Sequence, residues 1–231
     1  MPDREQKNGA SGGALPWEPS GKPRKMKRAG MVIDLRRCIG CHACSVSCKT
    51  EHDVALGAFR TRVRYLEKPK SAQLAFLPLL CMHCEDAPCI PACPTKAMVK
   101  KDDGRVTVEH AKCEGTTDCI SACPYDAIAL DPTTGIADKC DFCTHRTDVG
   151  MDPACVAACP TDTLRFGDLD DPNDEAMQYA QKHNARAFRE DAKTKPTVTY
   201  VGMRPWKEEA TKGGIQLNFE EDELIYVQKK D

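Results

Sequence analysis

Fifteen cysteines carry most of the chemistry available to this sequence, and they fall into four groups. The groups are Cys38-x2-Cys41-x2-Cys44-x3-Cys48, Cys81-x2-Cys84-x4-Cys89-x3-Cys93, Cys113-x5-Cys119-x3-Cys123 and Cys140-x2-Cys143-x11-Cys155-x3-Cys159. Such crowding suits iron–sulfur clusters, because a short irregular loop can wrap a cube of iron and sulfide with thiolates from successive positions. A proline follows the last cysteine of three groups and would end the loop there. The spacing predicts clusters of the bacterial ferredoxin type.

Disulfide bonds and structural zinc are the two competing uses of so many thiols. Cysteines two residues apart cannot pair neatly with one another, and an odd count leaves at least one thiol over. Disulfide scaffolds also suit small secreted chains, and this chain has 231 residues. Structural zinc favours paired C-x2-C knuckles with four ligands per ion, a pattern that only the fourth group approaches. Because the ferredoxin spacing recurs four times, iron–sulfur clusters are the favoured interpretation.

The third group lacks one cysteine. Thr116 lies three residues after Cys113 and three before Cys119, where the middle cysteine of such a run is expected. A threonine hydroxyl is a poor iron ligand near neutral pH, since its alkoxide is costly to form. Three ligands most simply give a 3Fe–4S cluster. The alternative is a 4Fe–4S cluster with a non-cysteine ligand, for which Asp118 offers a carboxylate two residues from the expected position.

The elements that hold these loops must be short. Three loops continue alike, as Cys93-Pro-Thr-Lys-Ala-Met98, Cys123-Pro-Tyr-Asp-Ala-Ile128 and Cys159-Pro-Thr-Asp-Thr-Leu164. Turn residues 101–105 separate apolar residues 98–99 from 106–108, and residues 131–135 separate 128–130 from 136–137, so two hairpins are predicted. We expect an α+β fold of short helices and β-hairpins around the clusters. Aromatic residues make up only 6% of the chain, so the clusters would fill part of the core.

Composition and motifs exclude several functions. Lys and Arg number 33 against 35 Asp and Glu, which excludes a strong basic field for nucleic acid. No run approaches the ~20 apolar residues of a membrane span, and the nearest, 74–82, is broken by Pro78. No nucleophile–base pair, Walker loop or dinucleotide fingerprint occurs. We therefore expect an electron carrier that makes and breaks no substrate bonds itself.

Several segments resemble a known family. They are Gly30-Met-Val-Ile-Asp-Leu-Arg-Arg-Cys-Ile-Gly-Cys-His-Ala-Cys44, Cys81-Met-His-Cys-Glu-Asp-Ala-Pro-Cys89, Lys139-Cys-Asp-Phe-Cys-Thr-His-Arg146, Pro153-Ala-Cys-Val-Ala-Ala-Cys-Pro160 and Gly167-Asp-Leu-Asp-Asp-Pro172. They are similar to the four-cluster iron–sulfur subunit of complex molybdoenzymes, the electron-transfer partner in the dimethyl sulfoxide reductase family. The resemblance covers residues 29–173, and 196–201 resemble the closing strand. Segments 52–61 and 65–67 look closest to the sulfite dehydrogenase branch and to the polysulfide, tetrathionate and arsenate reductase branches.

Crossed ligand sets follow from this resemblance, whereas spacing alone leaves the pairing open. The implied sets are Cys38, Cys41, Cys44 and Cys159; Cys140, Cys143, Cys155 and Cys48; Cys81, Cys84, Cys89 and Cys123; and Cys93, Cys113 and Cys119 beside Thr116. The cofactors would be three 4Fe–4S clusters and one 3Fe–4S cluster, or four 4Fe–4S clusters with one non-cysteine ligand. Thr116 departs from the four-cysteine pattern of many members. Pairing motif 38–48 with 140–159, and 81–93 with 113–123, would make two pseudo-symmetric ferredoxin-like modules.

The family also implies partners. The protein would relay single electrons between a catalytic subunit that holds molybdenum or tungsten with bis-pyranopterin guanine dinucleotide and a membrane subunit that exchanges electrons with quinone. Alternatives are a free-standing polyferredoxin and an electron-transfer subunit of a formate dehydrogenase or hydrogenase. The complex would be membrane-associated, either facing the cytoplasm or exported together with its catalytic subunit.

Three regions are expected. Residues 1–28 form a flexible basic arm, and 29–172 form the double ferredoxin-like domain. Residues 173–231 supply a helix within 174–189, a strand and an extension that packs on a partner subunit or on the chain itself. Cations flanking the motifs, which would offset cluster charge or stay solvated, are Arg36, Arg37, Lys49, Lys96, Lys139 and Arg146. His42, His83 and His145 lie inside the motifs, where packing or a bond to cluster sulfur is expected rather than iron ligation.

Overall fold

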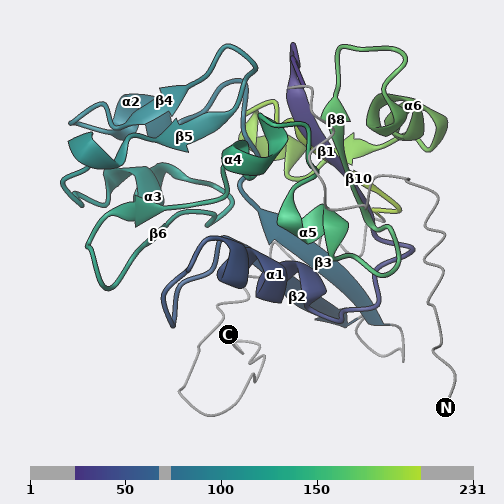
Figure 1. The fold of residues 1–231 in the computed structure, drawn as a ribbon, viewed down its shortest axis with the longest axis horizontal. Helices are drawn as coiled ribbons and strands as arrows, with labels where there is room; N and C mark the ends of the chain where they lie inside the picture. The colour runs from purple at the N-terminus through teal and green to yellow at the C-terminus, as the bar shows by residue number, and fades with distance from the viewer. Residues whose placement is uncertain (1–23, 68–73, 204–231) are drawn as a thin grey trace, which may run out of the picture.

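The computed structural model describes residues 24–67 and 74–203, and its elements are short and mixed (Figure 1). The helices are α1 (Ala43–Glu51), α2 (Cys89–Ala92), α3 (Asp118–Ala122), α4 (Thr144–Thr147), α5 (Ala154–Ala157) and α6 (Glu175–Lys182). The strands are β1 (Ala29–Asp34), β2 (Thr61–Glu67), β3 (Leu74–Leu80), β4 (Met98–Lys100), β5 (Val106–Val108), β6 (Ala129–Leu130), β7 (Ala137–Asp138), β8 (Leu164–Asp168), β9 (Arg186–Ala187) and β10 (Val198–Val201). Turns of 3₁₀ helix cover His110–Lys112 and Glu190–Ala192. The mixture of small helices and strands agrees with the expected α+β class.

One four-stranded sheet contributes to the hydrophobic core, which also contains residues of β2, β3 and the cysteine loops. Its strand order is β8-β1-β10-β9, with β1 antiparallel to β8 and parallel to β10. Every residue of β1 is buried, and α6 packs on β1 and β8 (Figure 1). Only glycine fits at position 30 of β1, because a Cβ there would lie 2.2 Å from Leu169 Cδ1 and 2.7 Å from the Thr197 carbonyl oxygen. The strand expected within 196–201 is β10.

Helix α6 is shorter than the helical composition of residues 174–189 indicates. Asp174 begins it by accepting a hydrogen bond from the Ala176 amide at 2.8 Å. Asn184 then takes a left-handed conformation (φ 49°), and the Ala185 amide bonds back to the Ala180 carbonyl. The backbone therefore leaves the helix after Lys182 and can form β9.

Both predicted hairpins are confirmed, and a third is longer than either. β4 pairs with β5 from Met98↔Val108 to Lys100↔Val106, and β6 pairs with β7. The third hairpin joins β2 to β3 over seven paired positions. The apolar stretch that Pro78 interrupts is therefore a strand.

The cysteine loops are held in pairs by helix packing. Helix α1, from the first group, packs on α5 from the fourth, and α2, from the second group, packs on α3 from the third. In Figure 1, α2, α3, β4, β5 and β6 gather at one side of the molecule, apart from α1 and α5. This packing favours the nested pairing of the four groups. A pseudo-symmetric relation between the two halves stays a prediction.

Residues 24–28, the described end of the expected arm, contact the body of the protein. The amides of Lys27 and Arg28 donate to the Asp168 carboxylate at 2.8 and 3.0 Å, and Arg28 Nε bonds to Asp170. The rest of the arm and the extension from 204 onward lie outside the described residues. Within the described part of the sequence, no helix is long and apolar enough to cross a membrane.

Candidate iron–sulfur centres

All fifteen cysteines lie among the described residues, and all are free thiols. Nine are buried, five are partly exposed, and Cys41 is exposed. The loops therefore present reduced sulfur to the interior rather than cross-links between elements. Thiols held this way are the donor type that iron–sulfur clusters require.

Two small cavities in one half of the protein are lined by separate sets of thiols. One is lined by Cys81, Cys84, Cys89 and Cys123. The other is lined by Cys93, Cys113 and Cys119, and Thr116 lies in the same wall. Asp118 is exposed and is absent from that lining, whereas the carboxylate residue Glu114 belongs to it. These groupings are the ones that the family resemblance implies for the second and third groups.

The first and fourth groups lie close together, since helix α1 packs on α5. Burial raises the pKa of Cys44 to about 11, and the thiols of Cys38 and Cys159 act in the same direction. Burial also raises the pKa of Cys140, where Cys48 and Cys155 contribute with the same sign. The thiol of Cys159 is therefore close enough to act on Cys44, and that of Cys48 on Cys140, although Cys81 of the second group also acts on Cys140.

The loop around Thr116 has the backbone of the loop around Cys41. Gly40 and Gly115 have φ of 71° and 70°, and each lies one residue before the compared position. One residue after it, His42 and Thr117 have φ of 59° and 66°, and a helix begins directly beyond each. Thr116 thus occupies in its loop the place that Cys41 occupies in the first.

The three Cys-Pro repeats share a hydrogen bond to sulfur. The amide four residues on donates to the thiol: Ala97 to Cys93 at 3.2 Å, Thr163 to Cys159 at 3.3 Å, and Ala127 to Cys123. A left-handed residue makes each tight turn, namely Lys96, Asp126 or Asp162. At Cys93 and Cys159, burial would raise the pKa, but several hydrogen bonds together lower it. They come from Thr95, Met98 and Ala97 at Cys93, and from Thr161, Thr163 and Leu164 at Cys159. The sequence repeat indicated the turn without revealing the donor to sulfur.

His83 supplies a buried donor beside the second group. Its side chain is fully buried, and Nδ1 accepts from the Val106 amide at 3.0 Å. Burial lowers the pKa of this imidazole well below its ordinary value, so the neutral ring carries its proton on Nε2. That N–H has no partner among the described residues. A buried N–H without a partner, within the Cys81-x2-Cys84 loop, is a donor that cluster sulfur can accept from, and the two cavities lined by thiols supply the ligands. The residues present therefore fit the implied cofactor.

Other candidate side chains hold structural contacts. Lys139 is buried and donates to the carbonyls of Val106 and Cys140. Its charge partly opposes burial, which raises the pKa of Cys89 to about 12. The remaining contacts pair Arg36 with Asp34, Arg37 with Asp162, Lys49 with two carbonyls, Arg146 and His145 with Glu51, and His42 with Tyr65.

Two functional candidates were missed from the sequence. His52 Nε2 lies 3.1 Å from Cys143 Sγ, and Arg60 Nη1 lies 2.8 Å from His52 Nδ1. Both residues fall outside the cysteine runs and act across the fold. Their position within segment 52–61 was the only signal available.

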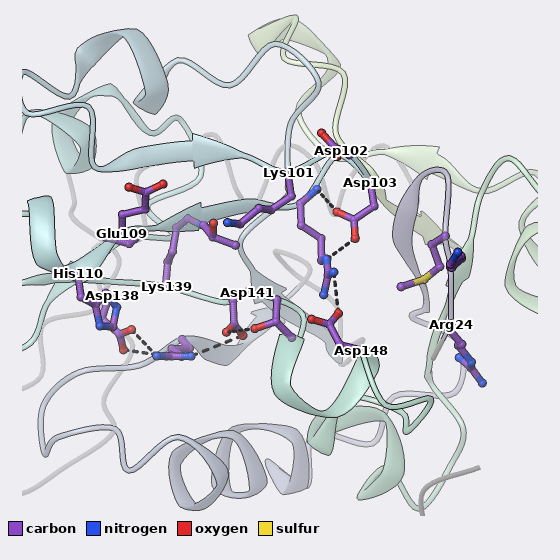
Figure 2. Close-up of a pocket in the computed structure, with 17 residues that line it drawn as sticks. Arg24, Lys101, Asp102, Asp103, Glu109, His110, Asp138, Lys139, Asp141 and Asp148 are labelled. Atoms are coloured by element: carbon purple, nitrogen blue, oxygen red, sulfur yellow. Dashed lines mark hydrogen bonds and ion pairs between the residues drawn. The ribbon is translucent and has the colours of Figure 1, made fainter. Parts of the chain in front are cut away.

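A charged cavity of about 890 Å³ opens between the β4–β5 hairpin, β7 and α4 (Figure 2). Arg105 lies in its wall and joins Asp103 at 2.6 Å to Asp148 at 2.8 Å. None of the residues lining it is a cysteine. The cavity is therefore separate from the thiol sets.

Comparison with known proteins assigns the family. Residues 72–169 match the model of the 4Fe-4S dicluster domain. The sequence is 39% identical over 198 residues to a subunit of tetrathionate reductase from Salmonella typhimurium, covering 82% of this chain and 78% of that one. It is 38% identical over 196 residues to a component of polysulfide reductase from Wolinella succinogenes (82% and 98% covered). It is 32% identical over 224 residues to arsenate respiratory reductase iron-sulfur subunit ArrB of a Shewanella strain (75% and 96%). The predicted resemblance is confirmed, and this protein belongs to the family of ferredoxin-type iron–sulfur subunits that transfer electrons in complex molybdoenzyme reductases.

Proposed function

We propose that this protein relays single electrons through four clusters held by the crossed thiol sets. The observation that carries the proposal is the separation of seven thiols into two cavities, together with the packing of α1 from the first group on α5 from the fourth. When bound, the clusters supply one-electron oxidation and reduction. The protein's own residues bind them, exclude water and donate hydrogen bonds to sulfur.

The proposed ligand sets are Cys38, Cys41, Cys44 and Cys159; Cys48, Cys140, Cys143 and Cys155; Cys81, Cys84, Cys89 and Cys123; and Cys93, Cys113 and Cys119. The first two sets would form one ferredoxin-like module, because α1 packs on α5, and the last two would form the other, because α2 packs on α3. Substituting one cysteine of a set with serine should alter one cluster signal in electron paramagnetic resonance (EPR) spectra. Two members of one set must alter the same signal, so different signals would refute that set.

The set beside Thr116 is proposed to hold a 3Fe–4S cluster. Three thiols line its cavity, and a hydroxyl occupies the place of a fourth. EPR spectra of the oxidised protein should show a three-iron signal, with about fifteen irons per chain. No such signal, together with about sixteen irons, would support a four-iron cluster with an oxygen ligand instead.

The partners are proposed to be a molybdenum or tungsten bis-pyranopterin subunit and a membrane subunit that exchanges electrons with quinone. Relatives named as parts of tetrathionate, polysulfide and arsenate reductases support this arrangement. Purification of the native protein, with metal analysis and membrane fractionation, tests it. We expect recovery with molybdenum or tungsten in a membrane-bound complex. A lone monomer without either metal would favour a free polyferredoxin.

A further inference from the structure

His52 reaches a cysteine of the fourth group from the far end of helix α1. Its side chain is 8% exposed, and Nε2 lies 3.1 Å from Cys143 Sγ. On the other side of the ring, Arg60 Nη1 lies 2.8 Å from Nδ1. The residues come from separate parts of the sequence, since 91 positions separate His52 from Cys143.

Arg60 is itself fixed in place. Its Nε and Nη2 bond to the two oxygens of Asp138 at 2.9 and 2.7 Å, and its side chain is 11% exposed. Asp138 and Asp141, both labelled in Figure 2, lie on either side of the Arg60 guanidinium, which bonds to the first and lies 3.6 Å from the second. A planar guanidinium held by a two-point carboxylate contact has little freedom to turn away from His52.

The contact from Arg60 decides which nitrogen of His52 carries the proton. A guanidinium has donors and no acceptor, so Nδ1 must accept from it. The ring proton of neutral His52 is therefore on Nε2, which faces the sulfur. Cys143 Sγ consequently receives a side-chain N–H hydrogen bond.

The same residues could be taken for a separate metal site, because ligand atoms of His52, Asp141 and Cys143 lie within 4.8 Å of one another. Two contacts oppose that interpretation. Arg60 Nη1 lies 3.6 Å from Asp141 Oδ1, so a second cation would sit beside a guanidinium. The Nε2 atom holds the proton and offers no lone pair to a metal.

We propose that His52 is a positioning residue that donates its Nε2–H to the Cys143 thiolate and raises the reduction potential of the cluster bound there. Reduction adds negative charge to a cluster, and a hydrogen bond to a ligand sulfur stabilises that charge. The inference rests on the proposed ligand role of Cys143. It assigns to one side chain outside the cysteine motifs the tuning of one cluster among four.

The test is an EPR-monitored redox titration of the native complex carrying single substitutions in this protein. Cys143→Ser identifies the signal of the cluster concerned. His52→Leu removes the donor and replaces the imidazole with an apolar side chain, whereas His52→Gln retains an N–H donor. His145→Gln is the matched control. The His145 ring packs edge-on against the His52 ring, with ring centroids 5.1 Å apart, but it bonds to Glu51 instead of sulfur. Iron content is measured for every variant.

We expect His52→Leu to move the midpoint potential of that one signal to a more negative value with iron content unchanged. The shift should be smaller in His52→Gln and absent in His145→Gln. An unmoved potential in His52→Leu, or equal shifts in the Leu and Gln variants, overturns the donor role while leaving the relay intact. If Cys143→Ser alters no cluster signal, the ligand set fails and the inference fails with it. Loss of a non-iron metal from His52→Leu, with all potentials unmoved, would establish the separate metal site instead.

Discussion

Phe142 stacks on His83 with ring centroids 3.7 Å apart and planes inclined by 23°. Each is the third residue of a Cys-x2-Cys loop, in the fourth and second groups, and each has positive φ (57° and 44°). Phe166 of β8 packs against Phe142 at 5.1 Å. The stack therefore joins the Cys-x2-Cys loop of the second group directly to that of the fourth.

Truncating this contact should be costly. Phe142→Ala is expected to lower the free energy of unfolding by about 3–5 kcal/mol, because the ring is fully buried and leaves a cavity. Phe59→Ala is the control, since Phe59 is only partly buried and lies under Lys49 at 4.3 Å. Its expected cost is about 1–2 kcal/mol. Anaerobic urea unfolding of the loaded protein measures both, and equal losses would contradict a special role for the stack.

A cysteine at position 116 should change the cluster that Cys93, Cys113 and Cys119 are proposed to hold. Thr116→Cys places a thiol where the matching loop has Cys41, so we expect about one more iron per chain and loss of the three-iron EPR signal. Thr117→Cys adds a thiol one residue away, at the left-handed position directly before helix α3, and should leave the spectrum unchanged. If both variants behave alike, the loop correspondence is wrong.

Arg105 fastens the β4–β5 hairpin to helix α4. It bonds to Asp103, Asp148 and the Thr147 hydroxyl, and its side chain is 10% exposed. Arg105→Met should cost about 3 kcal/mol, because it strands the largely buried carboxylate of Asp103. Arg24→Met breaks the exposed pair with Asp152 and should cost less than about 1 kcal/mol. Thermal unfolding compares the stability of the two variants. If Arg105→Met loses no more stability than Arg24→Met, the hairpin is held by other contacts.

Tyr179 helps to keep a carboxylate charged in the interior. Burial would raise the pKa of Asp34, but bonds from Arg36 and the Tyr179 hydroxyl at 2.6 Å lower it to about 2, from 3.8. Because the folded-state pKa is depressed, this stabilisation is fully present above about pH 4 and is lost as the pH falls toward 2. Tyr179→Phe should cost about 1–3 kcal/mol at pH 7.

The pH dependence gives the check on that prediction. The difference between wild type and Tyr179→Phe should stay constant from pH 7 to 5 and shrink below pH 4, as followed by urea unfolding with circular dichroism. Arg189→Met, which removes an exposed pair with Asp191, should show no comparable pH dependence. A difference that persists unchanged at pH 3 would argue against Asp34 as its source.

Local patterns predicted local structure well. The turns at 101–105 and 131–135 gave two correct hairpins, because each turn joins short apolar runs that are neighbours in the sequence. The place of β1 between β8 and β10 depends on partners more than a hundred positions away, which periodicity does not encode. The bond from His52 to Cys143 escaped for the same reason. Helix α6 was overestimated, since composition does not reveal the left-handed turn at Asn184.

Because Met31 of β1 pairs with Val198 of β10, the four-stranded sheet cannot form until most of the chain has been synthesised. Strand β1 leaves the ribosome early and has no partners until β8 and β10 follow. Its apolar residues therefore remain unpaired through most of synthesis. Helices α2 and α3, together with the β4–β5 hairpin between them, are complete well before α5 has emerged. We expect the second and third cysteine groups to be able to bind iron before the fourth group has been synthesised and can pair with the first. The thiols of the first group would therefore have to stay reduced until β10 has been synthesised.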